Sequence, residues 1–251
     1  MNLRIRGMLH ADLRALDGGI GRCQDFLFDD SSWTIRYMVA DTRKWLPGRK
    51  VLISPSALGD WDWQADEMPV RLDRDAIEAC PPLTSDMPVS RQYEVAIAAY
   101  YHWPTYWQGP HLWGGAMSPR VERTVAARPL ETIEKPGESN LRSVKEVSGY
   151  HIQAVDDTAG HVDDFLLERD TWAIRYLVVD TRNWLPGRKV LISPAWADTI
   201  DWKRSRITVG MHRTAIEASP VYDPERGPPS PDEETALHRH YDFKPYWWDG
   251  A

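Results

Sequence analysis

The chain has few cysteines, no long apolar run and no recognisable leader sequence. Its 251 residues include only Cys23 and Cys80, which do not form a C-x-x-C pair. A disulfide framework, a cysteine-based zinc site and a thioredoxin-type motif are therefore excluded. No stretch approaches the roughly 18 consecutive apolar residues of a membrane span, and the N-terminus lacks the apolar region of a signal peptide. We expect a cytoplasmic protein with no membrane insertion.

Positive charge is also scarce relative to negative charge. Lys and Arg number 30 against 37 Asp and Glu, which gives a formal net charge of -7. Such a chain has no overall basic field to hold a phosphate backbone. We therefore expect no nucleic-acid partner.

Motifs for common catalytic chemistry are missing as well. The sequence contains no nucleophile elbow, zincin, P-loop or dinucleotide-binding string. His238 and His240 are two residues apart on a predicted helix, so their rings point to different faces and do not suit a chelating pair. We predict no enzymatic activity, no catalytic residue, no cofactor and no metal site.

What the chain does contain is a long internal repeat. Residues 21–55 align with residues 160–194 at a constant offset of 139, and 23 of these 35 positions are identical. Residues 45–55 recur without change as residues 184–194. A period of this length is too long for a solenoid, so the repeat predicts two domains.

Within each copy the apolar residues follow the period of β-strands. Alternating apolar residues at 33–39 and 172–179, each preceded by a short strand and a polar cluster, predict one β-hairpin per copy. Shorter strands are predicted at residues 13–16, 50–54, 62–64 and 70–72 of the first copy. Five or six short strands in about 75 residues favour a small β-barrel, because a barrel leaves few strand edges exposed.

The 13 Trp and 10 Tyr, against 4 Phe, are concentrated partly in two further matching segments. Residues 101–107 match residues 241–247, and each segment follows a predicted helix, at residues 91–102 and 231–241. Ser230, Pro231 and Glu233 have the spacing of a helix N-terminus with a capping box. We predict that each aromatic arm docks on its barrel, since acidic neighbours argue against a nucleobase-stacking surface.

These features predict a mainly β fold, with two small barrels in tandem, each followed by a short helix and an aromatic arm. The expected divisions are residues 1–80 for the first barrel, 81–107 for its arm, 108–140 for a linker rich in Gly and Pro, 141–219 for the second barrel and 220–251 for its arm. Because the copies are alike, we also expect intramolecular pairing of the barrels about a pseudo-twofold axis, with further homo-oligomerisation left open.

The second copy resembles a known family. The segments that carry the resemblance are LRSVKEVSGYH at 141–151, GHVDDFL at 160–166, YLVVDT at 176–181, WLPGRKVLI at 184–192 and AIEASP at 215–220. They look like the PRC-barrel family, named for the cytoplasmic domain of the photosynthetic reaction-centre H subunit and including the C-terminal domain of the ribosome-maturation factor M. The first copy is also similar, although its opening at residues 3–10 departs from the pattern. The resemblance implies a PRC-type barrel fold.

The resemblance favours one kind of relative. The sequence shows no transmembrane helix and no separate domain ahead of the first copy, so we expect likeness to stand-alone bacterial PRC-barrel proteins. For such proteins the resemblance implies protein binding, with no particular partner or activity.

Eight residues are candidates for binding a partner. The Trp-Leu-Pro-Gly loops place large apolar side chains beside a turn, where they either anchor a partner or close one end of the barrel. The nearby arginines either hold a carboxylate or phosphate of the partner or pair with carboxylates of this acidic chain. The candidates are Trp45, Leu46, Arg36 and Arg43, with their copies Trp184, Leu185, Arg175 and Arg182.

Two functions remain open at this point. We prefer a non-enzymatic protein-binding or scaffolding module made of two PRC barrels. The alternative is a ligand- or cofactor-dependent protein, linked to electron transfer by analogy with the reaction-centre subunit. A deep pocket lined by convergent polar groups with shifted pKa values would favour the alternative.

Overall fold

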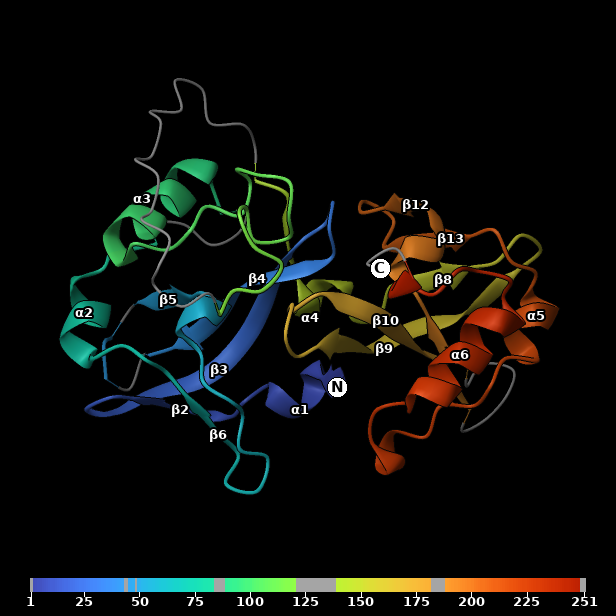
Figure 1. Ribbon diagram of the computed structural model, residues 1–251, viewed down its shortest axis with the longest axis horizontal. Helices are drawn as coiled ribbons and strands as arrows, with labels where there is room; N and C mark the ends of the chain where they lie inside the picture. Colours follow the sequence, from blue (N-terminus) through green and yellow to red (C-terminus); the bar gives the residue numbers. More distant parts are fainter. Residues whose placement is uncertain are drawn as a thin grey trace. The chain divides into compact units, whose positions relative to one another are not determined.

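Strands dominate the structure, which is a computed structural model (Figure 1). It describes residues 2–42, 45–47, 49–83, 89–120, 139–181 and 188–248. The strands in these ranges form one sheet of six and one of seven, accompanied by short helices. Among the described residues, no helix has the length and apolar character needed to cross a membrane. The predicted mainly β class is therefore confirmed.

The six-stranded sheet has the order β5-β4-β3-β2-β6, and β7 pairs with β3. The β2–β6 pairing is parallel and the other pairings are antiparallel. The strands are β2 (Asp12–Ala15), β3 (Gly18–Asp29), β4 (Thr34–Asp41), β5 (Lys50–Ile53), β6 (Glu67–Pro69) and β7 (Leu141–Ser143).

The seven-stranded sheet repeats this arrangement. Its order is β11-β10-β9-β8-β13-β12, and β1 pairs with β9. The strands are β1 (Asn2–Arg4), β8 (His151–Gln153), β9 (Thr158–Glu168), β10 (Ile174–Asp180), β11 (Lys189–Ile192), β12 (Ala197–Asp201) and β13 (Arg206–Val209). The predicted hairpins are confirmed as β3–β4 and β9–β10. No pairing among the described residues joins the two ends of either sheet, so closed barrels stay a prediction.

Within the described ranges, six short α-helices accompany the strands. They are α1 (Ile5–Met8), α2 (Arg74–Ala79), α3 (Arg91–Tyr101), α4 (Val144–Val147), α5 (Arg213–Glu217) and α6 (Pro231–His240), with 3-10 turns at Pro55–Ala57, Pro194–Trp196 and Pro224–Arg226. The two predicted helices are confirmed as α3 and α6. Ser90 and Ser230 are their N-caps, and Ser230 forms a capping box with Glu233.

The polypeptide divides into two compact units that exchange residues between the copies. The N-unit contains Arg6–Lys145 and Asp170–Ala173, and the C-unit contains Met1–Ile5, Glu146–Arg169 and Ile174–Ala251. The first strand of each copy therefore lies in the sheet of the other copy.

Equivalent contacts hold the two exchanged strands. In the C-unit, Arg4 Nε lies 3.1 Å from the buried carboxylate of Asp164. In the N-unit, the Ser143 hydroxyl donates to Asp25. These pairs correspond at the repeat offset of 139. The predicted divisions at residues 1–80 and 141–219 each kept the first strand with its own copy, whereas the observed units exchange these strands. The pattern of a three-residue strand does not indicate which sheet the strand joins.

Candidate functional site

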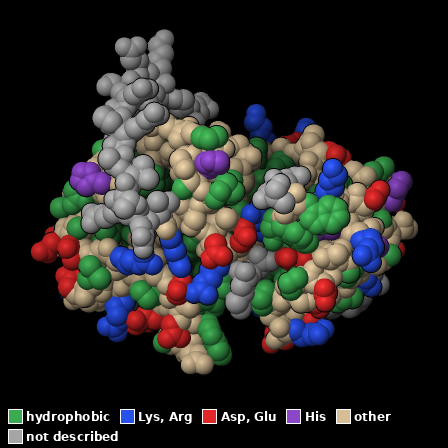
Figure 2. Space-filling view, viewed as in Figure 1, with side chains coloured by type: hydrophobic (Ala, Val, Ile, Leu, Met, Phe, Trp, Pro, Cys, Tyr) green, Lys and Arg blue, Asp and Glu red, His purple; other side chains and the backbone are tan. Residues whose placement is uncertain are grey.

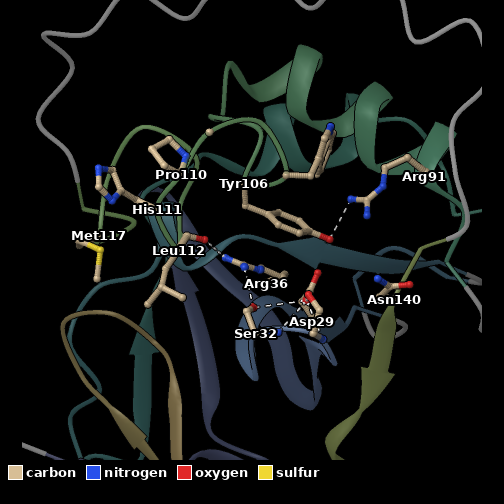
Figure 3. A pocket seen from close by; sticks show the side chains of 13 residues that line it. Asp29, Ser32, Arg36, Arg91, Tyr106, Pro110, His111, Leu112, Met117 and Asn140 are labelled. Atoms are coloured by element: carbon tan, nitrogen blue, oxygen red, sulfur yellow. Dashed lines mark hydrogen bonds between the residues drawn. The ribbon is translucent and has the colours of Figure 1, made fainter. Parts of the chain in front are cut away.

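A pocket of about 600 Å³ lies within the N-unit. The end of β3 and strand β4 supply its floor, α3 supplies one wall, and residues 106–117 supply much of the rest (Figure 3). The lining residues are Asp29, Ser31, Ser32, Arg36, Arg91, Tyr106, Trp107, Gly109, Pro110, His111, Leu112, Met117 and Asn140. Asp29, Arg36 and Tyr106 are buried, whereas Ser31, Pro110, His111, Met117 and Asn140 are exposed at the rim.

Arg36 is the central charged residue of this pocket. It is only 3% exposed, because its guanidinium lies 4.0 Å from the ring centre of Tyr106 and 5.0 Å from that of Trp113. The alternating apolar residues of β4 predict a strand with one buried face. Instead, almost every residue of the strand is buried, including Arg36 on the other face. The arm and the following loop supply the cover, which a pattern within the strand does not reveal.

The hydrogen bonds of Arg36 leave part of its guanidinium without an acceptor. Nη1 donates to the Leu112 carbonyl, and Nη2 donates to the Ser32 hydroxyl at 2.9 Å (Figure 3). Nε is buried and has no hydrogen-bond partner. Burial lowers the pKa of Arg36, with Asp29 opposing this effect. An arginine has five N–H donors, so Arg36 retains capacity for an acceptor.

Asp29 lies close by but is engaged elsewhere. Its Oδ1 accepts from the backbone N–H groups of Ser31 at 3.0 Å and Ser32 at 3.1 Å, and also from the Ser31 hydroxyl. This arrangement is an Asx turn at the tip of the hairpin. Among the described residues, no carboxylate forms an ion pair with Arg36.

A buried polar cluster supports the pocket from the side of α3. Tyr106 donates its hydroxyl to Glu94 Oε2 at 2.7 Å, and Arg91 Nη1 lies 3.0 Å from the Tyr106 oxygen and 3.1 Å from Glu94 Oε1. Burial raises the pKa of Glu94 and of Tyr106. Burial alone would lower the pKa of Arg91, but Glu94 and Tyr106 raise it. The cluster fixes Tyr106 against Arg36.

The equivalent arginine of the C-unit has a different environment. Arg175 donates from Nε to Glu168 Oε2 at 3.0 Å and also donates from Nη2 to the same oxygen. Its guanidinium lies 4.1 Å from the ring centre of Tyr246, the counterpart of Tyr106. Both arms therefore pack against a strand arginine, which confirms that each arm docks on its own sheet. Of the two candidate arginines that the structure describes, Arg175 pairs with a carboxylate and Arg36 does not, so the pairing that the sequence analysis left open is observed at Arg175.

The other candidate residues fall partly outside the described chain. Trp45 and Leu46 are half-buried, and the Arg74 guanidinium lies 4.7 Å from the Trp45 ring. Trp45 is thus neither fully buried nor fully free. The remaining four candidates lie outside the described residues: Arg43, Arg182, Trp184 and Leu185.

The sequence analysis missed most of the pocket. Arg91 lines it, and Glu94 and Trp113 contact the lining residues Tyr106 and Arg36, but none of the three was singled out as a site residue. One signal was available, because Arg91 corresponds to Pro231 in the second copy and so marks a place where the copies differ. Trp113 lies in the segment assigned to a linker, where Gly-Pro and Gly-Gly pairs indicated a turn but not its packing.

A second surface lies on the arm of the C-unit. Phe243 stacks on the buried Trp196 with ring centres 5.0 Å apart, and Trp247 lies 5.3 Å from the His238 ring. The outer parts of this arm remain exposed, by 38% for Phe243, 37% for Trp247 and 63% for Trp248. Hydrophobic side chains gather on the surface of this unit in Figure 2. We call Phe243, Trp247 and Trp248 the arm cluster.

No model of a known protein family matches the chain, and no curated protein shows a significant match to it. The resemblance to PRC-barrel proteins thus remains a prediction from the motifs. Within the described ranges, no group of three or more His, Cys, Asp or Glu side chains has the proximity needed to hold a metal ion.

Proposed function

We propose that the chain is a non-enzymatic protein-binding module made of two PRC-barrel-like units. The observation that carries this proposal is the arm cluster, in which Phe243 stacks on Trp196 and Trp247 packs edge-on against His238, while all three side chains of the cluster stay partly exposed to water. Rigid aromatic residues supply much of the binding energy of protein interfaces, because they bury large areas and lose little side-chain entropy. The half-buried Trp45 and Leu46 belong to the same proposal as a second contact surface.

Both copies belong to the proposed module, since each copy gives the other an equivalent strand through the exchange of β1 and β7.

Affinity capture with matched tryptophan variants tests the proposal. The immobilised full chain is compared with Trp247→Ala/Trp248→Ala and with Trp63→Ala, which changes a tryptophan that is 71% exposed in the N-unit. We expect quantitative mass spectrometry to find proteins that the wild type and Trp63→Ala capture in equal amounts. The captured amount of these proteins should fall at least about tenfold with the double variant. Retention of the same proteins by all three chains would contradict the assignment of the arm cluster.

A ligand-dependent protein is the second candidate function, and the pocket around Arg36 favours it. The pocket brings together polar groups from β3, β4, α3 and the first arm, and burial lowers the pKa of Arg36 and raises that of Tyr106. These are the features expected of a small-molecule site. The analogy with electron transfer gains no support from the pocket itself.

A further inference from the structure

The environment of Arg36 points to a specific kind of ligand. We propose that the N-unit pocket binds a small organic carboxylate, whose oxygens accept from the Arg36 guanidinium. This inference does not depend on the protein-binding proposal, because no residue of the arm cluster lines the pocket.

The first argument is the state of the Arg36 charge. A buried charge is costly unless it is paired and its donors are satisfied. Arg36 has two neutral acceptors, the Leu112 carbonyl and the Ser32 hydroxyl, and two aromatic rings. Its Nε has no acceptor. An anion at this edge would supply the missing acceptor and would pair directly with a guanidinium that forms no ion pair with a described carboxylate.

The second argument comes from the other copy. Glu168 occupies the position in the repeat that corresponds to Asp29, and Arg175 corresponds to Arg36. In the C-unit, one oxygen of Glu168 accepts from both Nε and Nη2 of Arg175. Asp29 is one methylene shorter, and its Oδ1 serves the Asx turn instead. The ligand carboxylate would therefore take the place at Arg36 that Glu168 takes at Arg175.

The third argument concerns the rest of the ligand. The volume of about 600 Å³ suits a small organic molecule. The rim carries the apolar side chains of Pro110 and Met117, and the Trp107 ring forms part of the wall beside Arg91. An apolar body therefore fits better than a fully hydrated ion. The Asp29 carboxylate lies in the pocket lining, where it would repel a doubly charged phosphate more strongly than a singly charged carboxylate.

Binding of benzoate to the full chain tests the proposal, with benzamide and inorganic phosphate as comparison probes. We expect saturable binding of benzoate, measured by chemical-shift changes of amides around the pocket, and at least about tenfold weaker binding of the neutral, isosteric benzamide. Phosphate should not compete. Absence of saturable benzoate binding, equal binding of benzamide, or a preference for phosphate would each overturn the proposal.

Three variants locate the site. Arg36→Gln should abolish benzoate binding, and Arg175→Gln, the matched change in the C-unit, should leave it unchanged. Asp29→Glu introduces the longer side chain that the C-unit has at the equivalent position. The new carboxylate should pair with Arg36, and this pairing should weaken benzoate binding by at least about tenfold. Thermal unfolding confirms that each variant is folded. If Arg36→Gln does not fold, Asp29→Glu decides, and unchanged benzoate affinity in that variant would overturn the proposal.

Discussion

Gly21 and Gly160 occupy the same place in the two copies, where β3 and β9 pass close to the last residues of β4 and β10. Their φ angles are +118° and +123°, a region that residues with a Cβ rarely adopt. A Cβ would lie 1.9 Å from the Asp41 carbonyl oxygen at Gly21 and 2.4 Å from the Asp180 carbonyl oxygen at Gly160. Both positions therefore require glycine for conformation and for space.

We predict that Gly21→Ala lowers the free energy of unfolding by about 2–4 kcal/mol, because it combines backbone strain with a collision against the main chain. Urea unfolding of the full chain, followed in the N-unit, provides the measurement. Gly19→Ala is the control, since a Cβ there meets nothing within 4 Å. Equal effects of the two changes would show that the close approach at Gly21 is not maintained in solution.

At the scale of elements, α6 and its arm form an aromatic cluster around His238. The His238 side chain is 2% exposed, and its Nε2 lies 3.0 Å from the Tyr176 hydroxyl. The rings of Trp196 and Trp247 lie 5.0 and 5.3 Å away. Burial lowers the pKa of His238. The corresponding residue of α3 is Ala98, so the two arms are packed by different chemistry after the same helix start.

This lowered pKa predicts a pH-dependent stability of the C-unit. Because the folded state disfavours the protonated imidazole, the unfolded chain binds the proton more readily, and stability is lost as the pH falls below the unfolded value near 6.5. Urea unfolding between pH 7.5 and about 5 should show a smaller loss in His238→Gln than in the wild type. His102→Gln, a change at the exposed end of α3, controls for removal of one imidazole. Parallel curves for the wild type and His238→Gln would contradict this prediction.

At the scale of the whole molecule, the exchanged strands make each unit depend on both copies. Ile5, at the end of the segment that joins the C-unit, is fully buried, and Leu141 of β7 is 3% exposed. β1 pairs along β9 from Asn2↔Glu168 to Arg4↔Leu166, and β7 pairs with β3 in the same way. Neither sheet is complete from its own copy alone.

We predict that removing residues 2–5 destabilises the C-unit rather than the copy from which these residues come. Backbone amides of β9 should lose hydrogen-exchange protection by about tenfold or more, while those of β3 should keep theirs. Leu141→Ala is the reciprocal change and should affect β3 while sparing β9. The exchange of strands would be contradicted if removing residues 2–5 lowered the protection of β3 and Leu141→Ala lowered that of β9.

The sequence alone determined the features that depend on neighbouring residues. The hairpins follow from alternating apolar residues beside polar turns, and the starts of α3 and α6 follow from the Ser caps. The duplication was evident from identity at one offset. Arg36 and Arg175 were recognised as a pair, although their sequence context is almost the same and did not distinguish their environments.

Only the tertiary structure decided what these elements contact. β1 and β7 are three residues long, and their patterns suit either sheet, so the exchange depends on long-range packing. The burial of Arg36 depends on Tyr106 and Trp113, which lie about 70 residues or more away along the chain. A one-methylene difference between Asp29 and Glu168 then decides whether the arginine is paired. Local patterns carry no information on such distant contacts, because the free energy that selects them comes from groups brought together only by folding.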